Sequence, residues 1–555
     1  MIENLIKLPS FGSFPHELRR VTQTHFFFML RKLVFLLLAI TCVYGNWPRP
    51  TLSIKGSNIL LVNPDTFHVN VSVEIPILNR AIQRYMTQAL FFPFTVYNTP
   101  PDAKLIQNLF ITVANSSEEL QLGVDESYQL FIEQEHSYQV FMYTNTVWGA
   151  LRGLETFSQL IEFNLDTRQY SINCVPFEIE DAPRFPWRGL MIDTSRHYLV
   201  PRTILRVIDA MSYSKFNTLH WHVVDAESFP LVVPSFPLLS EKGTWSPVAI
   251  YPPKFIEFVV AYAKDRGIRV VIEIDMPGHA YSWGYGYPQI IANCPTYMYQ
   301  KDTVPLNPTL NETYTVVNGV LNQVKLTTLD NYMHLGGDEV QYGCMQEDPS
   351  IQAWMTEHNI TNVDTLGQIF QTQLEGIMNN LSRSAVHWED IWNYGFPAPS
   401  NTIFQVYSSV QEVQAMLNAN VYTINSYGWY LDVQSPLSQD TYEWVDTWQQ
   451  MWQFDPLIQA NVSESTYQYF LGGEALMWGD QVDDVCIDSR VWPRACAIAE
   501  RLWSQSYDLL DTYGAKSRLI DFRCRLARRG IGAGPIDPGY CPLPRDFDVN
   551  FFDII

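Results

Sequence analysis

The stretch HLGGDEV, residues 334–340, places two carboxylates side by side, Asp338 and Glu339, directly after an apolar run that begins at Tyr332. Neighbouring like charges repel each other, and most Asp-Glu pairs lie in solvated turns at the surface. A catalytic pair at the end of a buried strand is the alternative interpretation. The rest of the chain decides between the two.

Seven further runs share this form, a short apolar segment that ends in polar or charged residues. Continuous apolar runs are typical of parallel strands that are buried on both faces. Longer stretches with helical spacing separate the runs, such as residues 253–267, where Gly267 is a candidate C-cap. Eight such units predict a (β/α)₈ barrel, an α/β fold. The runs are residues 189–196, 216–225, 269–278, 332–339, 385–390, 402–407, 422–429 and 471–480.

Active sites of such barrels lie at the carboxyl ends of the strands, and the polar residues of these runs fall there. They are Arg196, Asp225, Asp275, Asp338, Glu339, Glu389, Asp390 and Asp480. A single acidic residue at a strand end indicates a solvated loop. Several acidic residues that converge at one end of a barrel indicate a site. Carboxylates, one arginine and a chain with 16 Trp indicate glycoside hydrolysis. Adjacent strand residues point to opposite sides, however, so Asp338 and Glu339 cannot both flank one sugar bond.

The chain divides into three parts by its patterning. Residues 46–183 contain alternating segments, which predict half-buried strands, and one amphipathic helix, so we expect a smaller α+β domain there. A Pro-rich joint at 181–189 marks its end. Residues 184–555 then form the barrel with a C-terminal tail.

The N-terminal part, residues 1–45, carries a targeting signal. A basic pair, Arg31 and Lys32, precedes an apolar run from Leu33 to Val43, which is too short to span a bilayer and is typical of a signal peptide. The preceding residues are unusual for a signal, so Met29 is a candidate for the true start. A membrane anchor with the N-terminus inside is the competing interpretation. Secretory entry predicts a lysosomal or secreted protein.

Secretory entry also predicts glycans and disulfides. Six asparagines stand in Asn-x-Ser/Thr sequons, namely Asn70, Asn115, Asn311, Asn359, Asn380 and Asn461. The chain has eight Cys and no C-x₂-C pair, so no zinc-ribbon pattern is present and no metal is expected. The formal net charge of −22 excludes nucleic acid and an anionic lipid surface as partners.

Nine stretches of the chain match one known family: HLGGDEV and residues 146–160, 188–199, 220–225, 275–279, 429–432, 472–479, 492–495 and 499–504. Together they resemble family 20 of the glycoside hydrolases, the β-N-acetylhexosaminidases, and most of all the lysosomal hexosaminidase subunits of animals. The resemblance covers nearly the whole chain after residue 46, in the family's order. It implies exo-hydrolysis of terminal non-reducing β-linked N-acetylhexosamine from glycoconjugates or chito-oligosaccharides, without a cofactor.

The resemblance also assigns the catalytic residues. The substrate's own 2-acetamido oxygen is the nucleophile, which gives an oxazolinium intermediate and retention of configuration. Glu339 is then the general acid and base, Asp338 orients the acetamide group, and Tyr430 donates a hydrogen bond to it. We expect the neighbouring charge of Asp338 to raise the pKa of Glu339 and hold it protonated. From the residues alone, a core role for Tyr430 stays open.

Further roles follow from the same resemblance. Arg196 binds ring hydroxyls, although a structural salt bridge is its alternative, and Trp388 and Trp478 form walls that could also be plain core. Asp225 and His279 support Glu339. Cys294 pairs with Cys344, and Cys524 pairs with Cys541, whereas Cys174, Cys486 and Cys496 have no assigned partner. A homodimer or heterodimer is expected by analogy.

Three positions depart from the family's pattern. Tyr407 stands where a Trp is usual, and Asp480 stands where a Glu binds the C4 and C6 hydroxyls, so the preference between N-acetylglucosamine and N-acetylgalactosamine stays open. Asp432 follows the Trp-Tyr-Leu motif and would repel 6-sulfated sugars. These changes keep a second hypothesis open, a glycan-binding protein with weak catalysis.

Overall fold

The computed structural model describes residues 45–543, except 93, 95, 98, 101, 133–137, 298–303, 433–446 and 506–510. The interpretations of Met29, the signal peptide and the alternative anchor therefore lie outside the described residues. Among the described residues, no helix is both long and apolar enough to cross a membrane.

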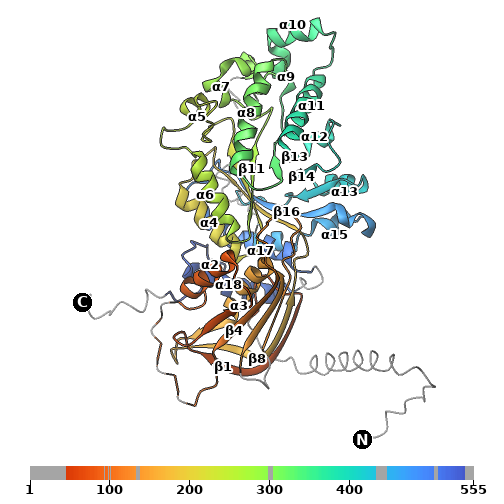
Figure 1. The fold of residues 1–555 in the computed structure, drawn as a ribbon. Coiled ribbons are helices and arrows are strands. Elements are labelled where there is room, and N and C mark those ends of the chain that lie inside the picture. Colours follow the sequence, from red (N-terminus) through yellow and green to blue (C-terminus); the bar gives the residue numbers. More distant parts are fainter. Residues whose placement is uncertain are drawn as a thin grey trace, which may run out of the picture.

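The N-terminal part of the described chain is a mixed sheet with two helices against it (Figure 1). Its strands run in the order β2-β4-β6-β5-β8-β1-β3, and β7 pairs with the beginning of β8. A buried cluster between the sheet and the helices includes Leu78, Leu109, Met142, Leu154 and Phe157. The elements are β1 (Leu52–Val62), β2 (His68–Val71), α2 (Pro76–Gln88), β3 (Leu105–Ile106), β4 (Asn108–Asn115), β5 (Tyr128–Ile132), β6 (Val140–Thr146), α3 (Val147–Leu160), β7 (Ile161–Asn164) and β8 (Gln169–Asp181).

Eight parallel strands then close into a barrel, β9 to β16, with β16 paired to β9. Each of the eight apolar runs in the sequence supplies one strand, so the predicted (β/α)₈ barrel after a smaller α+β part is confirmed. The strands are β9 (Trp187–Asp193), β10 (Thr218–Val224), β11 (Arg269–Ile274), β12 (Tyr332–His334), β13 (Ser384–Trp388), β14 (Ile403–Val406), β15 (Tyr422–Asn425) and β16 (Phe470–Met477).

Amphipathic helices surround the barrel in Figure 1. On α4, for example, Ile204, Val207, Ile208 and Met211 recur three and four residues apart, and all are buried against the strands. The predicted helix at 253–267 forms α6, and Gly267 after it adopts a positive φ of 68°. The long helices are α4 (Pro201–Tyr213), α6 (Pro253–Lys264), α8 (Asn311–Thr327), α11 (Asp364–Leu381), α13 (Val410–Asn418), α17 (Arg494–Trp503) and α18 (Thr512–Arg528).

Shorter helices lie in the loops that follow the barrel strands. They are α5 (Leu238–Gly243), α7 (Trp283–Gly286), η1 (Pro288–Ile290), η2 (Pro295–Tyr297), α9 (Tyr342–Glu347), α10 (Pro349–Glu357), α12 (Asp390–Asn393), α14 (Trp448–Gln453), α15 (Pro456–Ala460), η4 (Glu464–Tyr469) and α16 (Ile487–Val491). The disulfide from Cys294 to Cys344 ties the loop after β11 to α9, next to the loop that carries Asp338 and Glu339. Both pairings that the resemblance implies are present, since Cys524 is joined to Cys541.

Cys174 is also disulfide-bonded, whereas Cys486 and Cys496 are free thiols. All six sequon asparagines are exposed, as glycan attachment requires.

Buried ion pairs between side chains join the N-terminal sheet to the bottom of the barrel. Glu126, which precedes β5, accepts from Arg152 of α3 at 2.8 Å and from Arg188 of β9 at 2.7 Å. Asp181, at the end of β8, pairs with Lys215 of the barrel at 2.8 Å. All five side chains are at most 2% exposed, so these charges are paired with one another rather than with water.

Candidate active site

A glycine turn after β12 separates the two neighbouring carboxylates of HLGGDEV. Gly336 and Gly337 have φ values of 60° and 104°, and Glu339 itself has a φ of 50°. A Cβ atom on Gly336 would collide with the carboxylate of Asp275, which accepts the backbone N–H of Gly337 at 2.9 Å. As a result, Asp338 turns inward, with 12% of its side chain exposed, while Glu339 turns outward, with 65% exposed.

His279 lies next to both carboxylates. Its Nε2 atom is 3.5 Å from Glu339 Oε2 and 3.8 Å from Asp338 Oδ2, and its Nδ1 atom is 3.1 Å from Asp225 Oδ1. The loop after β11 brings this histidine to the mouth of the barrel, 60 residues before Glu339 in the sequence. Of the two residues to which the resemblance gives the support of Glu339, His279 therefore lies next to it and Asp225 lies behind His279.

The electrostatics of the pair differ from the sequence-based expectation. The hydrogen bond and charge of His279 lower the pKa of Glu339 below its usual range. Burial, helped by the charges of Glu273 and Asp390, raises the pKa of Asp338 to about 6. The expectation that Asp338 holds Glu339 protonated was wrong, because the turn points the two side chains apart and places a cation next to Glu339.

Arg196, after β9, is held by three carboxylates. It pairs with Asp225 at 2.8 Å, with Glu227 at 3.0 Å and with Asp193 at 3.3 Å. Its guanidinium also lies over the ring of Trp478, 5.1 Å from the centroid. The structural salt bridge that the sequence left open is therefore present, at a position that is still 11% exposed beside the aromatic wall.

An aromatic cluster forms one wall of the mouth. Trp388 is buried with Met191 and Leu476, and Tyr407, Tyr430 and Trp478 pack against them. The ring of Trp388 lies 5.7 Å from that of Tyr407 and 6.1 Å from that of Trp478. Burial raises the pKa of Tyr430 far above its usual value, so its phenol keeps its proton and remains a donor.

The three residues that depart from the family's pattern lie at or beside this mouth. The hydroxyl of Tyr407 donates to Asp390 at 3.0 Å, so a polar contact stands where the family usually has a larger ring. Burial, together with the charge of Asp480, raises the pKa of Asp432 to about 6. Asp480 is exposed, and its charge also acts on Arg196.

The sequence interpretation missed His222, Glu227 and Glu273. The carboxylate of Glu273, on β11, contacts His220 and His222, which both lie on β10. A signal existed for His222 and Glu273, because polar residues two apart in an otherwise apolar strand point to the same side. The pattern HWH at 220–222 and the pair Glu273 and Asp275 both have this spacing.

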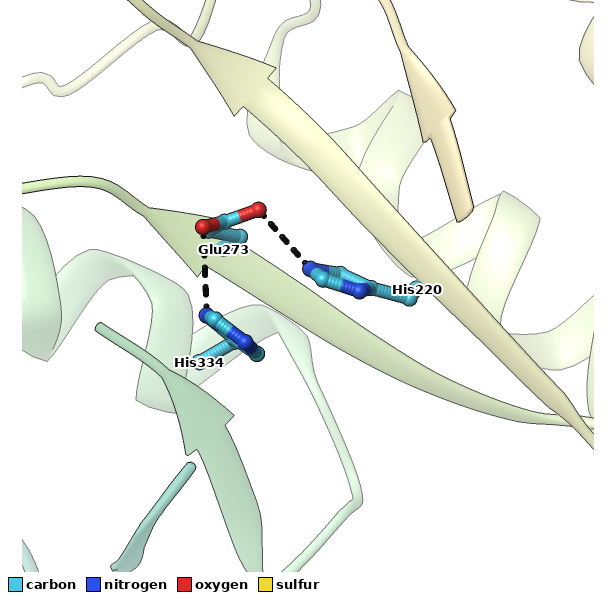
Figure 2. A group of neighbouring side chains, drawn as sticks. All are labelled: His220, Glu273 and His334. Atoms are coloured by element: carbon cyan, nitrogen blue, oxygen red, sulfur yellow. Dashed lines mark hydrogen bonds and ion pairs between the residues drawn. The ribbon is translucent and has the colours of Figure 1, made fainter. Parts of the chain in front are cut away.

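Three groups in the described part of the chain have the composition of a metal site. They are His220 with Glu273 and His334, Asp225 with Asp275 and His279, and His279 with Asp338 and Glu339. In each, the atoms that could bind a metal lie within 4.8 Å of one another. Figure 2 shows the first group, in which Glu273 lies between the two histidines.

Comparisons with known proteins identify the family of this chain. The family described as glycosyl hydrolase family 20, catalytic domain, matches residues 185–506, and one described as beta-acetyl hexosaminidase like matches residues 46–160. The chain belongs to glycosyl hydrolase family 20. It is therefore a glycoside hydrolase, and the resemblance seen in the sequence is confirmed.

Relatives from distant organisms cover nearly the whole chain. Beta-hexosaminidase subunit A1 of Dictyostelium discoideum is 41% identical over 93% of this chain and 96% of its own length. Beta-hexosaminidase subunit beta of Homo sapiens is 36% identical over 89% of both chains. The family 20 chitobiase of Flavobacterium johnsoniae has a TM-score of 0.75 at 27% identity, over 89% of this chain and 74% of its own.

Proposed function

We propose that this family 20 enzyme removes terminal non-reducing β-linked N-acetylglucosamine or N-acetylgalactosamine by substrate-assisted catalysis. One observation carries the mechanism: the turn at Gly336 and Gly337 sends Glu339 out to the mouth and Asp338 inward. A hydrolase with an enzymic nucleophile needs two carboxylates on opposite sides of the scissile bond, about 5 Å apart for retention. Asp338 is turned inward, away from Glu339, so we assign the leaving group to Glu339 and the role of nucleophile to the acetamide oxygen of the substrate.

The first half of the reaction closes a ring. The acetamide oxygen attacks the anomeric carbon as Glu339 protonates the leaving oxygen, which breaks the glycosidic bond and gives an oxazolinium ion. Asp338 accepts the acetamide N–H and stabilises the positive charge, while Tyr430 donates to the acetamide oxygen. An oxygen held within the substrate has a high effective concentration, so the enzyme only has to orient it.

The second half opens the ring. Glu339, now ionised, takes a proton from water, and the resulting oxygen attacks the anomeric carbon from the side that the leaving group vacated. The acetamide is restored, and two inversions give net retention. His279 and Asp225 support this exchange, because a cation beside Glu339 favours its ionised form.

The remaining mouth residues recognise the sugar. Trp388, Tyr407 and Trp478 form the apolar wall for the acetamide and the ring face. Arg196 and Asp480 contact ring hydroxyls, and Asp432 lies close to both the wall and Asp480. The shorter side chain of Asp480 relaxes the contact to the C4 hydroxyl, so both epimers are substrates.

We further propose the division of the chain and its destination. Residues 1–45 direct the chain into the secretory pathway, residues 46–183 form the accessory domain, and residues 184–555 form the catalytic barrel. The six exposed sequons carry glycans, and the enzyme works in the lysosome or outside the cell as a dimer.

Glu339→Gln tests the assignment. The variant should lose about 10²–10⁴-fold in kcat on chromogenic β-N-acetylglucosaminide and β-N-acetylgalactosaminide, because it can no longer donate a proton. Glu357→Gln, at the exposed end of α10, is the matched control and should keep full activity. A folded wild type that binds the product sugar but turns over neither substrate would favour the glycan-binding hypothesis instead.

A second experiment addresses the nucleophile. Fluorine atoms on the acetyl group withdraw electrons from the acetamide oxygen and weaken it as a nucleophile. The rate on aryl substrates should therefore fall steeply from the acetyl to the trifluoroacetyl compound. A rate that does not depend on the number of fluorine atoms would indicate an enzymic nucleophile and contradict the mechanism.

A further inference from the structure

Glu273 is a carboxylate in the middle of the barrel, on β11, with no exposed surface. Four side chains from three strands point polar atoms at it. His220 and His222 of β10 reach Oε2 at 2.8 Å and 2.5 Å. Trp388 of β13 donates to Oε1 at 2.8 Å, and His334 of β12 lies 3.2 Å from the same oxygen. Figure 2 shows Glu273 between His220 and His334.

The contacts fix the charge of two histidines. His220 has Glu474 at 2.7 Å on one nitrogen and Glu273 on the other, and His222 has Glu273 on one nitrogen and Asp225 at 2.8 Å on the other. A carboxylate accepts but does not donate, so a ring between two carboxylates carries protons on both nitrogens. Burial opposes this charge, yet the carboxylates outweigh it and raise the pKa of His220 to about 9.

These residues form one continuous line, which we call the buried ion-pair chain: Glu474, His220, Glu273, His222 and Asp225. Anions and cations alternate along it. Its last member, Asp225, contacts His279 at 3.1 Å, and His279 contacts Glu339 at 3.5 Å. The chain therefore connects the interior of the barrel to the carboxylate that transfers the proton.

Glu273 also belongs to the wall of the mouth. Its Oε1 atom holds the indole N–H of Trp388, and the ring of Trp388 packs against Tyr407 and Trp478. Glu273 is thus a member of the buried ion-pair chain and, through Trp388, also contacts this wall. A change in its charge would affect the line to Glu339, whereas loss of its acceptor atom would affect the wall.

A metal centre at His220, Glu273 and His334 explains these contacts less well. Two ligands around a tetrahedral zinc ion stand roughly 3.4 Å apart, since each bond is about 2.1 Å long. His220 and Glu273 are at the hydrogen-bond distance of 2.8 Å. A metal ligand also needs a free lone pair on the imidazole, and both nitrogens of His220 face carboxylates.

We propose that Glu273 is a positioning residue for the hydrolysis, which acts through His222, Asp225 and His279 on the proton transfer by Glu339. The negative charge of Glu273 keeps His222 as a cation. That cation contacts the Oδ2 atom of Asp225, which also pairs with Arg196, while the Oδ1 atom accepts the backbone N–H of Ala226 and holds His279 behind Glu339. The proposal rests on the role of Glu339 proposed above, and its test separates the two.

The test uses two substrates that differ in their need for a proton. The alkoxide of an alkyl N-acetyl-β-glucosaminide leaves only when protonated, whereas 2,4-dinitrophenolate leaves without a proton. In Glu273→Gln, the amide oxygen still accepts from Trp388, but the charge that holds His222 is gone. We expect kcat/KM, which reports the steps up to cleavage of the glycosidic bond, to fall about 100-fold on the alkyl substrate and less than about 5-fold on the dinitrophenyl substrate.

Asp330→Asn is the matched control. Asp330 pairs with Arg269 at 2.8 Å, and this ion pair is equally buried at the opposite end of the same strand, β11. Its loss should lower stability and change kcat/KM on both substrates by the same factor. Glu339→Gln marks the full effect of losing the acid: if it does not distinguish the two substrates, the proposed role of Glu339 fails, whatever Glu273 does.

The outcomes are distinct. A selective loss on the alkyl substrate in Glu273→Gln supports the proposal, and an equal loss on both substrates, as in Asp330→Asn, overturns it. His222→Gln removes the next cation along the chain and should show the same selectivity. If Glu273→Gln and His222→Gln both fail to fold while Asp330→Asn folds, the buried ion-pair chain has a structural role only. That result would also overturn the proposal.

Discussion

The imidazole of His279 stands between Asp225 and Glu339, 3.1 Å from the first and 3.5 Å from the second. A general acid is expected to have a raised pKa, yet this contact lowers the pKa of Glu339. Asp338 has the raised value, about 6. The protonated form that starts the reaction is therefore formed only in acid, and this has consequences for the pH dependence.

The first prediction is an acidic optimum. Activity needs Glu339 protonated and Asp338 ionised. As the pH rises, Glu339 loses its proton, and as the pH falls below about 6, Asp338 gains one. The required form is one of two singly protonated states of the pair, whose sum is largest between the two pKa values. We expect the maximum of kcat/KM below pH 6, measured from about pH 3 to about pH 8.

A maximum at or above neutral pH would contradict this assignment. Asp338→Asn provides the internal control for the acid limb. Without the carboxyl group that titrates near 6, kcat/KM should keep rising as the pH falls, until Glu339 is fully protonated.

The second prediction concerns the magnitude of the Asp338→Asn effect. Asparagine still accepts the acetamide N–H but carries no charge to stabilise the oxazolinium ion. Since that charge develops only on the way to the transition state, kcat should fall about 10²–10³-fold while KM changes little. Steady-state kinetics checks this prediction. Asp390→Asn is the control, because it removes the charge of a neighbouring carboxylate that contacts Tyr407 and the Glu339 backbone. A large rise in KM with an unchanged kcat would show that Asp338 only binds substrate.

The sequence alone predicted the barrel because each strand is a continuous apolar run that ends in a polar residue. All eight runs became strands, and Asp225, His279, Asp338 and Glu339 meet at the predicted carboxyl ends. What spacing could not give was the direction of each side chain. The inward turn of Asp338 depends on two positive φ values and on the distant Asp275.

The charges inside the barrel were also missed for a physical reason. Glu273 and His222 lie on strands inside the barrel, where an ionised side chain is costly unless a partner lies across the barrel. Their partners come from other strands, and a single sequence does not show which residues face each other. The HWH pattern at 220–222 indicated a polar face, but not its neighbours.

The third prediction concerns the joint between the sheet and the barrel. Glu126 lies between Arg152 and Arg188, and the two cations outweigh burial and lower its pKa. Glu126→Gln leaves two buried cations without their anion and should destabilise the fold by roughly 3 to 5 kcal/mol. Because Glu126 lies far from the mouth, kcat and KM below the unfolding temperature should stay unchanged.

Thermal unfolding at several pH values provides the sign check. A lowered pKa means that the folded chain holds its proton less tightly than the unfolded chain. The contribution of Glu126 is therefore fully present above the unfolded value and disappears as the pH falls through the folded value. The gap in unfolding temperature between wild type and Glu126→Gln should narrow in strong acid, whereas a constant gap would point to lost packing rather than lost charge.

The last prediction concerns sulfated substrates. Asp432 lies at the mouth with Asp480 near it, and burial with this neighbouring charge raises its pKa to about 6. When ionised it repels a 6-sulfate, and when protonated it does not, so the preference for the neutral sugar should grow as the pH rises through 6. The measurement is the ratio of kcat/KM for neutral and 6-sulfated aryl substrates at each pH. Asp432→Asn should bring this ratio close to one and make it independent of pH, and a ratio that keeps its pH dependence in the variant would move the discrimination to Asp480.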